Sequence, residues 1–290
     1  MFFQPAHHAL RARPALLADQ VALSNLFHFE PYIFRHLDWK RPLDWLGEQP
    51  FVVAEQKGRI VAALICPPEP PGVAWLRAFA AAGQVHLETA WQAVWSEAYQ
   101  MLTKQGRIRV AALCAENWMQ KLLARVGFRY TGAVVVLDWN PSLPLPRAHF
   151  PTRPRVMLPS DLPEVYAVDK ACFDPLWQNS EAILHMAFQQ AVFATVVEDQ
   201  AGIVGYQIST PSPQGGHLAR LGVHPRVQGQ GIGYALVHDV LIRFSNQALI
   251  QGRPQVTVNT QAENAASLAV YKKANFELTG HQYPVYEHFM

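Results

Sequence analysis

The segment VHPRVQGQGIGYALV, residues 223–237, has residue types and a spacing suited to binding an anion. Gly229, Gly231 and Gly233 alternate along it, and an apolar helical pattern begins at the last of them. The preceding pattern HLARLGV, residues 217–223, predicts a strand. Small residues let backbone N–H groups approach phosphate oxygens, and the dipole of a following helix favours negative charge. The segment therefore predicts a phosphate or pyrophosphate site at a helix N-terminus.

Two common phosphate-binding signatures do not fit this segment. A P-loop has Lys followed by Ser or Thr after its last glycine, where this chain has Tyr234 and Ala235. A Rossmann fingerprint has the pattern GxGxxG and opens a βαβ unit, whereas GQGIG lies deep in the chain. A glycine loop that only starts a helix tightly is the structural alternative, and the glycines alone leave it open.

A second set of residues follows in the same half of the chain. Its members are Asn264, Ser267, Tyr271 and Phe276. The spacing of Ser267 and Tyr271 places both on one face of a predicted helix. Together with QGQGIG, residues 228–233, this set resembles the signature of the GNAT superfamily of acetyl-CoA-dependent N-acetyltransferases. That signature has Gln/Arg-x-x-Gly-x-Gly/Ala after a strand ending in V-x-P, then a helix with Asn, a small residue, Tyr and Gly-Phe. The departure is Asn275 in place of the last glycine, and Asn is the next-best residue for a left-handed helix end.

The resemblance covers nearly all of residues 153–290 and implies a sheet that splays between two central strands, with acetyl-CoA in the opening. It implies that backbone groups of the strand around Leu221 and Val223 pair with the pantetheine arm. It assigns the pyrophosphate to amides of the glycine loop, and it turns Asn264 towards the cofactor. The loop residues are Gln228, Gly229, Gln230, Gly231, Ile232, Gly233 and Tyr234.

The same resemblance implies transfer of the acetyl group to a primary amine by direct attack in a ternary complex. The backbone amide of Val223 would stabilise the oxyanion that develops on the thioester carbonyl. Tyr271, whose phenol has a reference pKa of about 10, would protonate the departing thiolate as general acid. Holding amine and thioester together supplies much of the rate, so no covalent enzyme intermediate is needed. The structural alternative for Tyr271 is a packed core tyrosine.

The sequence does not identify a general base. Many relatives have a Glu on the strand before the loop, but HLARLGV contains no carboxylate. His217 is a candidate with a suitable reference pKa, and a solvated histidine at the start of a strand is its structural alternative. Glu198 and Asp174 are weaker candidates, and a water chain would need no residue at all.

The acceptor amine has one sequence signal. ACFDPLWQNS, residues 171–180, resembles the CF-x-x-PWS segment of N-terminal protein acetyltransferases, which lines the acceptor side of this fold, with Leu176 inserted. The alternative is a loop whose Phe173 and Trp177 anchor helices to the core. A peptide, a small metabolite and an antibiotic all stay open as acceptors.

The elements that must position these residues occur twice along the chain. FVVAEQKGRIVAALICPP, residues 51–68, predicts two strands joined by a turn, and TVVEDQAGIVGYQISTP, residues 195–211, has the same form. Aligning Phe128 with Phe276 also aligns the Thr and Gly that follow. Each half then has a helical start, a hairpin, a strand, a helix, a strand, a helix and a final strand. We infer a duplication; two unrelated domains with common patterns are the alternative.

The predicted fold class is α/β (α+β), with two tandem GNAT-like domains. Each would be a mixed, mostly antiparallel twisted sheet flanked by helices. Prolines cluster in residues 140–155, where they disfavour a continuous helix or a central strand. The predicted limits are residues 1–145 for the first domain, 146–155 for the Pro-rich linker and 153–290 for the catalytic domain.

The first half lacks the residues assigned to chemistry. After VAWLRAF the chain continues as AAAGQVHLETAW, with Gly83 and no glycine loop. Leu123 stands where the second half has Tyr271, and Glu116 stands where it has Asn264. We expect a degenerate GNAT copy with a structural or substrate-gating role. A different ligand in a pocket lined by its tryptophans is the alternative.

The composition indicates a globular cytoplasmic protein. Hydrophobic residues make up 50% of the chain and charged residues 16%, which is enough apolar material for two cores. A formal net charge of +2 gives no sign of a nucleic-acid or membrane partner. Cys66, Cys114 and Cys172 lie far apart, so neither a disulfide framework nor a metal site is predicted. We find no apolar run long enough to span a bilayer and no signal core in MFFQPAHHALRAR.

Two other functions stay open at this point. A non-catalytic acyl-CoA binding or sensing protein would keep the glycine loop and turn over no acceptor. A transferase of a longer acyl group would need more room beyond the splayed strands. Tyr271 separates catalysis from sensing, because removal of its hydroxyl would cripple turnover and spare cofactor binding.

Overall fold

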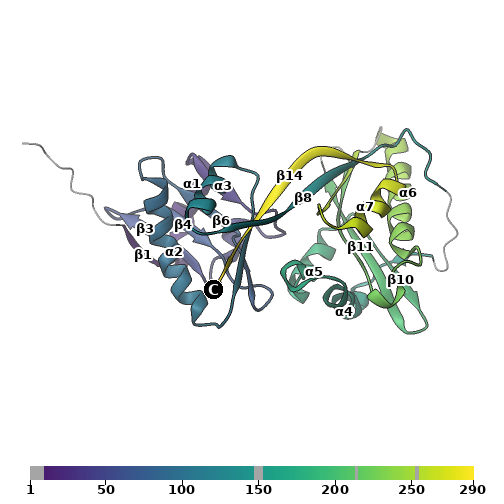
Figure 1. Ribbon diagram of the computed structural model, residues 1–290, viewed down its shortest axis with the longest axis horizontal. Helices are drawn as coiled ribbons and strands as arrows, with labels where there is room; N and C mark the ends of the chain where they lie inside the picture. Colours follow the sequence, from purple (N-terminus) through teal and green to yellow (C-terminus); the bar gives the residue numbers. More distant parts are fainter. Residues whose placement is uncertain (1–9, 147–152, 213–214, 252–254) are drawn as a thin grey trace, which may run out of the picture. The chain divides into compact units, whose positions relative to one another are not determined.

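The computed structural model describes residues 10–146, 153–212, 215–251 and 255–290 (Figure 1). The chain divides into two compact units. The N-unit comprises residues 1–131 and 284–290, and the C-unit comprises residues 132–283. Over the described ranges, no helix is both long enough and apolar enough to cross a membrane.

The C-unit is built on a mixed sheet with the strand order β14-β8-β13-β12-β11-β10-β9. The pairs from β9 to β12 are antiparallel, β12 and β13 are parallel, and β13 and β8 are antiparallel. The strands are β8 (Arg129–Trp139), β9 (Arg155–Val156), β10 (Phe193–Asp199), β11 (Gly202–Ser212), β12 (Gly215–Val223), β13 (Gln255–Gln261) and β14 (Phe276–Phe289).

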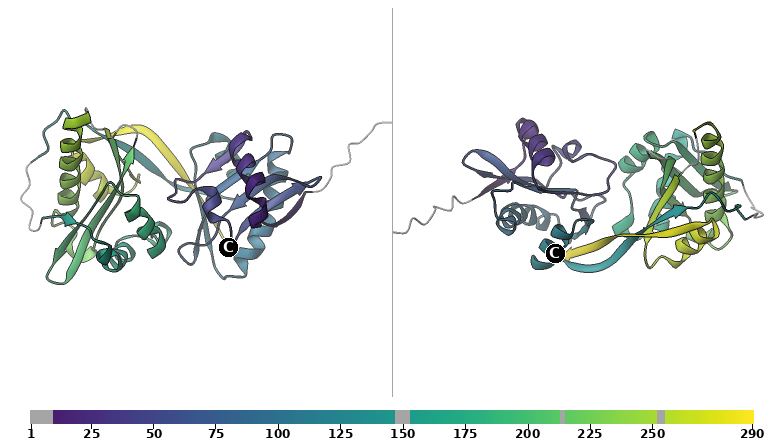
Figure 2. Two further views of the ribbon diagram at one scale, coloured as in Figure 1. Left: turned by 180° about the vertical axis from the view of Figure 1, so that it is seen from behind. Right: turned by 90° about the horizontal axis from the view of Figure 1, so that it is seen from above.

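Helices cover both faces of this sheet (Figure 1, Figure 2). They are α4 (Leu162–Cys172), α5 (Glu181–Gln189), α6 (Ile232–Gln251) and α7 (Ala265–Lys273). Successive residues of a strand point to opposite faces. On β11, Gly205 faces Ile232 of α6, and the next residue, Tyr206, donates a hydrogen bond to Asp169 of α4. Helices α4 and α6 therefore lie on opposite faces.

The face with α6 and α7 carries one core cluster of the C-unit. Val237, Val240, Leu241 and Phe244 are buried along α6 at the spacing that predicts an amphipathic helix. They pack with strand residues that include Leu218, Val256 and Val258. The cluster packs α6, and the end of α7 at Tyr271, against β12 and β13.

The N-unit has a sheet with the strand order β1-β3-β4-β6-β2. Its strands are β1 (Arg11–Pro14), β2 (Tyr32–Arg35), β3 (Phe51–Gln56), β4 (Arg59–Ile65) and β6 (Ala78–Ala81). A further strand, β5 (Val73–Trp75), is parallel to β7 (Arg109–Leu113). The helices are α1 (Gln20–Phe29), α2 (Leu87–Thr103) and α3 (Asn117–Arg125).

Strands β8 and β14 each contribute to both units. In the C-unit, Val134–Asp138 of β8 pair with β13. In the N-unit, Val285–Phe289 of β14 pair with β7. The compact units therefore depart from the predicted limits of 1–145 and 153–290, because the last strand of each half completes the other sheet. Within the predicted linker, 146–155, residues 147–152 lie outside the described residues.

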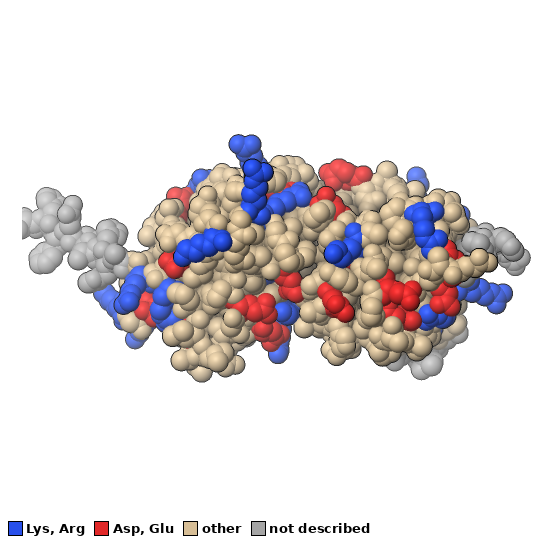
Figure 3. Space-filling view, turned by 90° about the horizontal axis from the view of Figure 1, so that it is seen from below, with Lys and Arg blue, Asp and Glu red and all other residues tan. Residues whose placement is uncertain are grey.

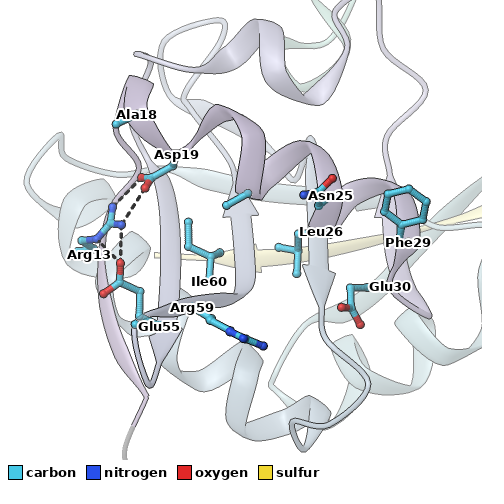
Figure 4. A pocket seen from close by; sticks show the side chains of 12 residues that line it. Arg13, Ala18, Asp19, Asn25, Leu26, Phe29, Glu30, Glu55, Arg59 and Ile60 are labelled. Atoms are coloured by element: carbon cyan, nitrogen blue, oxygen red, sulfur yellow. Dashed lines mark hydrogen bonds and ion pairs between the residues drawn. The ribbon is translucent and has the colours of Figure 1, made fainter.

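A repeated ion-pair network supports the inferred duplication. Arg13 of β1 lies 2.7 Å from Asp19 and 2.5 Å from Glu55 of the hairpin (Figure 4). The C-unit has the same network, with an arginine 2.7 Å from each of two carboxylates. Its members are Arg155, Asp161 and Glu198. Both units therefore fasten the chain entry to their hairpin in the same way.

Charged side chains are mixed on the face drawn in Figure 3, where Lys and Arg are interspersed with Asp and Glu. No large single-sign patch gathers on that face, in keeping with a net charge of +2. The site is therefore sought in the backbone and in buried side chains.

Candidate active site

The two parallel central strands of the C-unit pair over only part of their length. Strand β12 pairs with β13 from Gly215 to Leu218, yet β12 continues to Val223 and β13 to Gln261. On its other side β12 stays paired with β11 to its end. Among the described strands, none pairs with residues 219–223 of β12 on the β13 side. The splay that the family resemblance implies is present here.

A β-bulge lies where the two strands begin to separate. Across β11, Arg220 is opposite Ile208 and Leu218 is opposite Ser209, so Ala219 is the extra residue. A bulge bends its strand and increases the local twist. It therefore helps to turn the end of β12 away from β13.

The open edge of β12 presents backbone groups of Leu221 and Val223. The N–H of His224 donates to Val204 O at 2.8 Å, so residue 224 faces β11. Because backbone groups alternate in direction along an antiparallel strand, those of Leu221 and Val223 face the open side. The side chain of Gln228 donates to Val223 O at 3.0 Å, in agreement with this direction.

The glycine loop directly follows this strand. A 3-10 turn, Pro225–Val227, leads into exposed residues 228–231. Gly229 has φ +78° and Gly231 has φ +85°, in the left-handed region that favours glycine. A Cβ on either residue would meet no atom within 4 Å. Glycine is thus required by the backbone conformation, and the space beside it is open.

The N-terminus of α6 supplies backbone donors beside this loop. The first helical hydrogen bond runs from Ala235 N to Gly231 O at 2.9 Å. The amides of Ile232 and Gly233 precede it and, as the first amides of a helix, have no acceptor within the helix. Such donors at the positive end of a helix dipole favour an anion.

Gly233 brings three elements together. A Cβ at this residue would lie 3.7 Å from Val223 of β12 and 3.8 Å from Val270 of α7. The first turn of α6 therefore lies between the open strand end and the helix that carries Tyr271. This juxtaposition joins the two motifs that the sequence singled out.

Tyr271 follows Val270 on α7 and is buried, with 5% of its surface exposed. Its ring lies 5.6 Å from that of Phe276 in an edge-on arrangement. Burial raises the pKa of its hydroxyl, so the phenol keeps its proton at neutral pH. Among the described residues, none accepts a hydrogen bond from this hydroxyl. The side chain is therefore both a core tyrosine and a protonated donor whose hydroxyl has no acceptor in the described part of the chain.

Asn264 and Asn275 begin and end the helix of Tyr271. The side chain of Asn264 accepts from Ser267 N at 3.0 Å and caps α7. Asn275 has φ +65°, which confirms the left-handed helix end predicted for it. A cofactor contact by Asn264 stays a prediction beside this capping role.

The structure does not bring His217 together with Val223 and Tyr271. His217 lies in the paired part of β12, and its Nδ1 is 2.8 Å from Thr257 Oγ1. Val223 lies about 20 Å further along the extended strand, at about 3.3 Å per residue. Burial lowers the pKa of His217, which keeps the ring neutral.

The two carboxylates weighed as bases have structural partners. Glu198 lies 2.7 Å from Arg155 in the ion-pair network. Asp174 accepts from Leu176 N at 3.0 Å and caps the 3-10 turn Pro175–Trp177.

A buried cluster on the α4 side of β12 was not predicted from the sequence. Asp169 of α4 is fully buried and lies 2.6 Å from Arg220 of β12. The hydroxyl of Tyr206 donates to the same carboxylate. Burial alone would lower the pKa of Arg220, but the Asp169 carboxylate and the hydrogen bonds to Asp169 and Tyr206 outweigh it, so the pKa is raised. The available signal was a single arginine inside the apolar strand HLARLGV.

Cys172 lies between this cluster and the open strand end. A Cβ on Gly222 would come within 2.9 Å of its Sγ. Burial and then the charge of Asp169 raise the pKa of Cys172 to about 12, while Arg220 and the Val223 amide act in the opposite direction. The end of α4 therefore packs beside the strand residues that carry the open edge.

A family model described as an acetyltransferase (GNAT) domain matches residues 162–285. These residues form a GNAT acetyltransferase domain. The match runs from the start of α4 into β14 and contains the open edge, the glycine loop and Tyr271. Members of the GNAT family use acetyl-CoA as a co-substrate.

Two curated proteins are similar to parts of the chain. The peptidyl-lysine N-acetyltransferase YjaB of Salmonella typhimurium is 33% identical over 91 residues, which cover 31% of this chain and 54% of the relative. The chain thus spans about half the length of that relative. An acetyltransferase of Sodalis glossinidius is 27% identical over 127 residues, which cover 43% of this chain and 86% of the relative.

Solved structures match nearly the whole chain. A GCN5-related N-acetyltransferase from Sphaerobacter thermophilus has a TM-score of 0.62 at 17% identity and covers 97% of this chain and 95% of its own. A tandem GNAT protein from the clavulanic acid biosynthesis pathway has a TM-score of 0.60 at 15% identity and covers 97% and 98%. At these identities the likeness shows the fold, which is that of two tandem GNAT-like domains.

Proposed function

We propose that the GNAT domain transfers the acetyl group of acetyl-CoA to a primary amine by direct attack in a ternary complex, with the C-unit as the active unit. The observation that carries this proposal is the open edge of β12, which lies beside the α6 N-terminus and the helix of Tyr271. This nearness supports a shared site for a strand-like ligand arm, an anion and a proton donor.

The backbone at this place fits acetyl-CoA. The outward N–H and C=O groups of Leu221 can pair with the amides of an extended pantetheine arm, as an added strand would, which leaves the Val223 amide for the thioester carbonyl. The amides of residues 228–234 suit the pyrophosphate, because two left-handed glycines leave open space and the helix dipole favours anions. Asn264 adds a polar side chain at the start of α7. When bound there, acetyl-CoA supplies an activated thioester.

Two residues have roles in the transfer itself. The Val223 amide points to the open side and would stabilise the oxyanion on the thioester carbonyl. Tyr271 would protonate the departing thiolate, and the burial that raises its pKa keeps the proton available. The hydroxyl leaves its proton to the product and recovers one from solvent.

The incoming amine would lose its proton to water. The three residues considered as bases each have a structural partner: His217 contacts Thr257, Glu198 pairs with Arg155, and Asp174 caps a 3-10 turn. A water chain needs no residue there, so the pKa of the acceptor amine would govern the pH profile. The relative from Salmonella is named for peptidyl-lysine, and residues 171–180 resemble a segment of protein acetyltransferases. Both favour an amine on a peptide as the acceptor.

The experiment is incubation with acetyl-CoA and an amine panel of a lysine peptide, spermidine and kanamycin, with detection of free thiol. Calorimetry with acetyl-CoA runs in parallel. The proposal expects binding at one site and release of thiol with at least one amine. Binding without thiol release for every amine would favour the acyl-CoA sensor. Turnover of longer acyl-CoA in preference to acetyl-CoA would favour the longer-chain transferase.

A further inference from the structure

We infer that Arg220 is a positioning residue that fixes residues 173–180 beside the open end of β12 and so sets which amines the domain accepts. The inference rests on the proposed acetyltransferase function. It concerns neither motif of the cofactor site. It comes from the buried cluster that joins β12 to α4.

One guanidinium holds three separate parts of the chain to the strand. Its Nη2 and Nε lie 2.6 Å and 2.8 Å from the Asp169 carboxylate at the end of α4. Its Nη2 also donates to Trp177 O at 2.7 Å. Its Cζ lies 3.6 Å from the centre of the Phe173 ring, as in a cation–π contact. Arg220 therefore contacts Phe173 at the start of the turn, Trp177 in its middle and Asp169 in the helix before it.

The partner carboxylate is fully used. Asp169 is completely buried, and besides Arg220 it accepts hydrogen bonds from the Tyr206 hydroxyl and from Asn179 N at 3.0 Å. The side chain of Gln178 donates to Phe173 O at 2.9 Å and closes the turn on itself. These hydrogen bonds tie residues 173–180 into one piece, and Arg220 holds the piece to β12.

The piece lies against residues 221–223 of β12, the part of the strand that is proposed to bind the thioester. Arg220 directly follows the bulge residue Ala219 and directly precedes the open-edge residue Leu221. Cys172, next to the piece, lies beside Gly222 and the Val223 amide. A shift of residues 173–180 therefore moves the wall beside the reacting carbonyl. Misplacement by about 1 Å can cost about 100-fold in rate.

A buried ion pair is poor evidence for a purely stabilising role. Its desolvation penalty offsets the attraction, and apolar residues of similar volume often serve stability equally well. Asp169 and Arg220 instead have directional hydrogen bonds that specify one arrangement of the turn. The C-unit also contains Arg155–Asp161, an Arg–Asp pair away from the open edge, which serves as a matched control.

The test compares Arg220→Lys with Arg155→Lys. Lysine keeps the charge but loses the forked hydrogen bonds and the flat contact with Phe173. For Arg220→Lys we expect the Kd of acetyl-CoA to stay within about twofold, because Leu221 and the glycine loop are unchanged. We expect kcat/KM for the best amine to fall about 100-fold. The kcat/KM ratio between the two best amines of the panel should change by about tenfold, and Arg155→Lys should leave that ratio unchanged.

Hydrogen exchange provides a readout that needs no turnover. In Arg220→Lys, amides of residues 173–180 should exchange about tenfold faster, the effect of losing one charge-assisted hydrogen bond, while α6 and α7 keep their rates. Tyr206→Phe, which removes only one hydroxyl from Asp169, should give a smaller change in the same residues. If wild type turns over no amine, the proposed function fails, and exchange still decides whether Arg220 holds the piece.

Two results would overturn the inference. One is a fall of kcat/KM by the same factor for every amine in Arg220→Lys. The ratios between amines would then be unchanged, as expected for a purely structural role. The other is faster exchange spread over the whole C-unit, or no change in residues 173–180.

Discussion

Strand β6 of the N-unit and strand β12 of the C-unit occupy equivalent places in the repeat, but their outer edges differ. Strand β6 pairs with β4 on one side, and on the other side Tyr32–Arg35 of β2 pair with Ala78–Ala81. Strand β12 pairs with β11, and among the described strands its last residues have no partner on the other side. The N-unit has therefore filled with its own chain the edge that the C-unit leaves open.

The loops after these strands differ in the same way. In the N-unit, Gly83 N donates to the Glu30 carboxylate at 2.9 Å, and a Cβ on Gly83 would lie 3.1 Å from Pro31. In the C-unit, Gly229 and Gly231 face open space. A carboxylate of the N-unit thus takes an amide at the place where the C-unit offers amides to an anion. In the N-unit, the lack of a glycine loop thus accompanies a hydrogen bond that occupies the corresponding amide.

Several tryptophans of the N-unit are core residues, and Trp118 is partly buried against the same core. Trp75, Trp91 and Trp95 are at most 8% exposed. The ring of Trp91 stacks on that of Trp95 at 5.5 Å and meets Phe79 edge-on at 5.2 Å. A GNAT-like sheet can therefore be kept while the edge that would bind a ligand is used for packing.

The largest expected effect is the loss of the proposed general acid, Tyr271, which the N-unit lacks. Tyr271→Phe should lower kcat about 100- to 10,000-fold, because a positioned proton donor contributes that much, and should leave the Kd of acetyl-CoA unchanged. Steady-state kinetics and calorimetry measure the two quantities. Tyr166→Phe, on α4, removes a tyrosine hydroxyl elsewhere in the C-unit and should change neither. Full activity in Tyr271→Phe would remove the assigned role.

The next effect compares glycines of the two units. Gly231→Ala should weaken acetyl-CoA binding about tenfold, because an L-residue at φ +85° costs about 1–2 kcal/mol. Gly83→Ala should leave the Kd unchanged, since that amide already binds Glu30. Calorimetry on both variants gives the comparison. Equal losses would place part of the cofactor site in the N-unit.

The number of cofactor sites tests the closed edge directly. We expect one acetyl-CoA per chain, because β2 covers β6, whereas among the described strands the end of β12 has no partner on the β13 side. Calorimetric titration with concentrations calibrated by absorbance measures this number. Glu30→Gln removes the carboxylate charge from Gly83 but not β2, so it should also bind one. A stoichiometry of two in wild type contradicts the comparison.

The smallest effect concerns His217 in the closed part of β12. His217→Gln should change kcat less than about twofold, because the ring is about 20 Å along the strand from Val223. Burial lowers the pKa of His217. Below about pH 6.5 the unfolded chain therefore takes up a proton that the folded chain does not. The free energy of unfolding consequently decreases as the pH is lowered. Urea unfolding at pH 7.5 and 5.5 should therefore show a smaller loss in the variant. A 100-fold loss of kcat would instead support His217 as the base.

Local structure was predictable because it follows from short-range patterns. The hairpins at residues 51–56 and 59–65, and their counterparts β10 and β11, lie where alternation and turn residues place them. Helix α6 has the predicted buried stripe, and Asn275 has the predicted left-handed conformation. The motif spacing also selected the elements around the open edge, since Gly233 contacts both β12 and α7.

The sequence by itself therefore determined the order of the elements, the duplication, and the loop and helix that mark the candidate site. Only the tertiary structure decided which strand fills which edge. Hydrogen-bonded partners in a sheet can lie anywhere along the chain, so the exchange of β8 and β14 and the cover of β6 by β2 leave no local pattern. The pairing of Arg220 with Asp169 has the same origin, because two residues far apart in sequence meet only after strand and helix have packed.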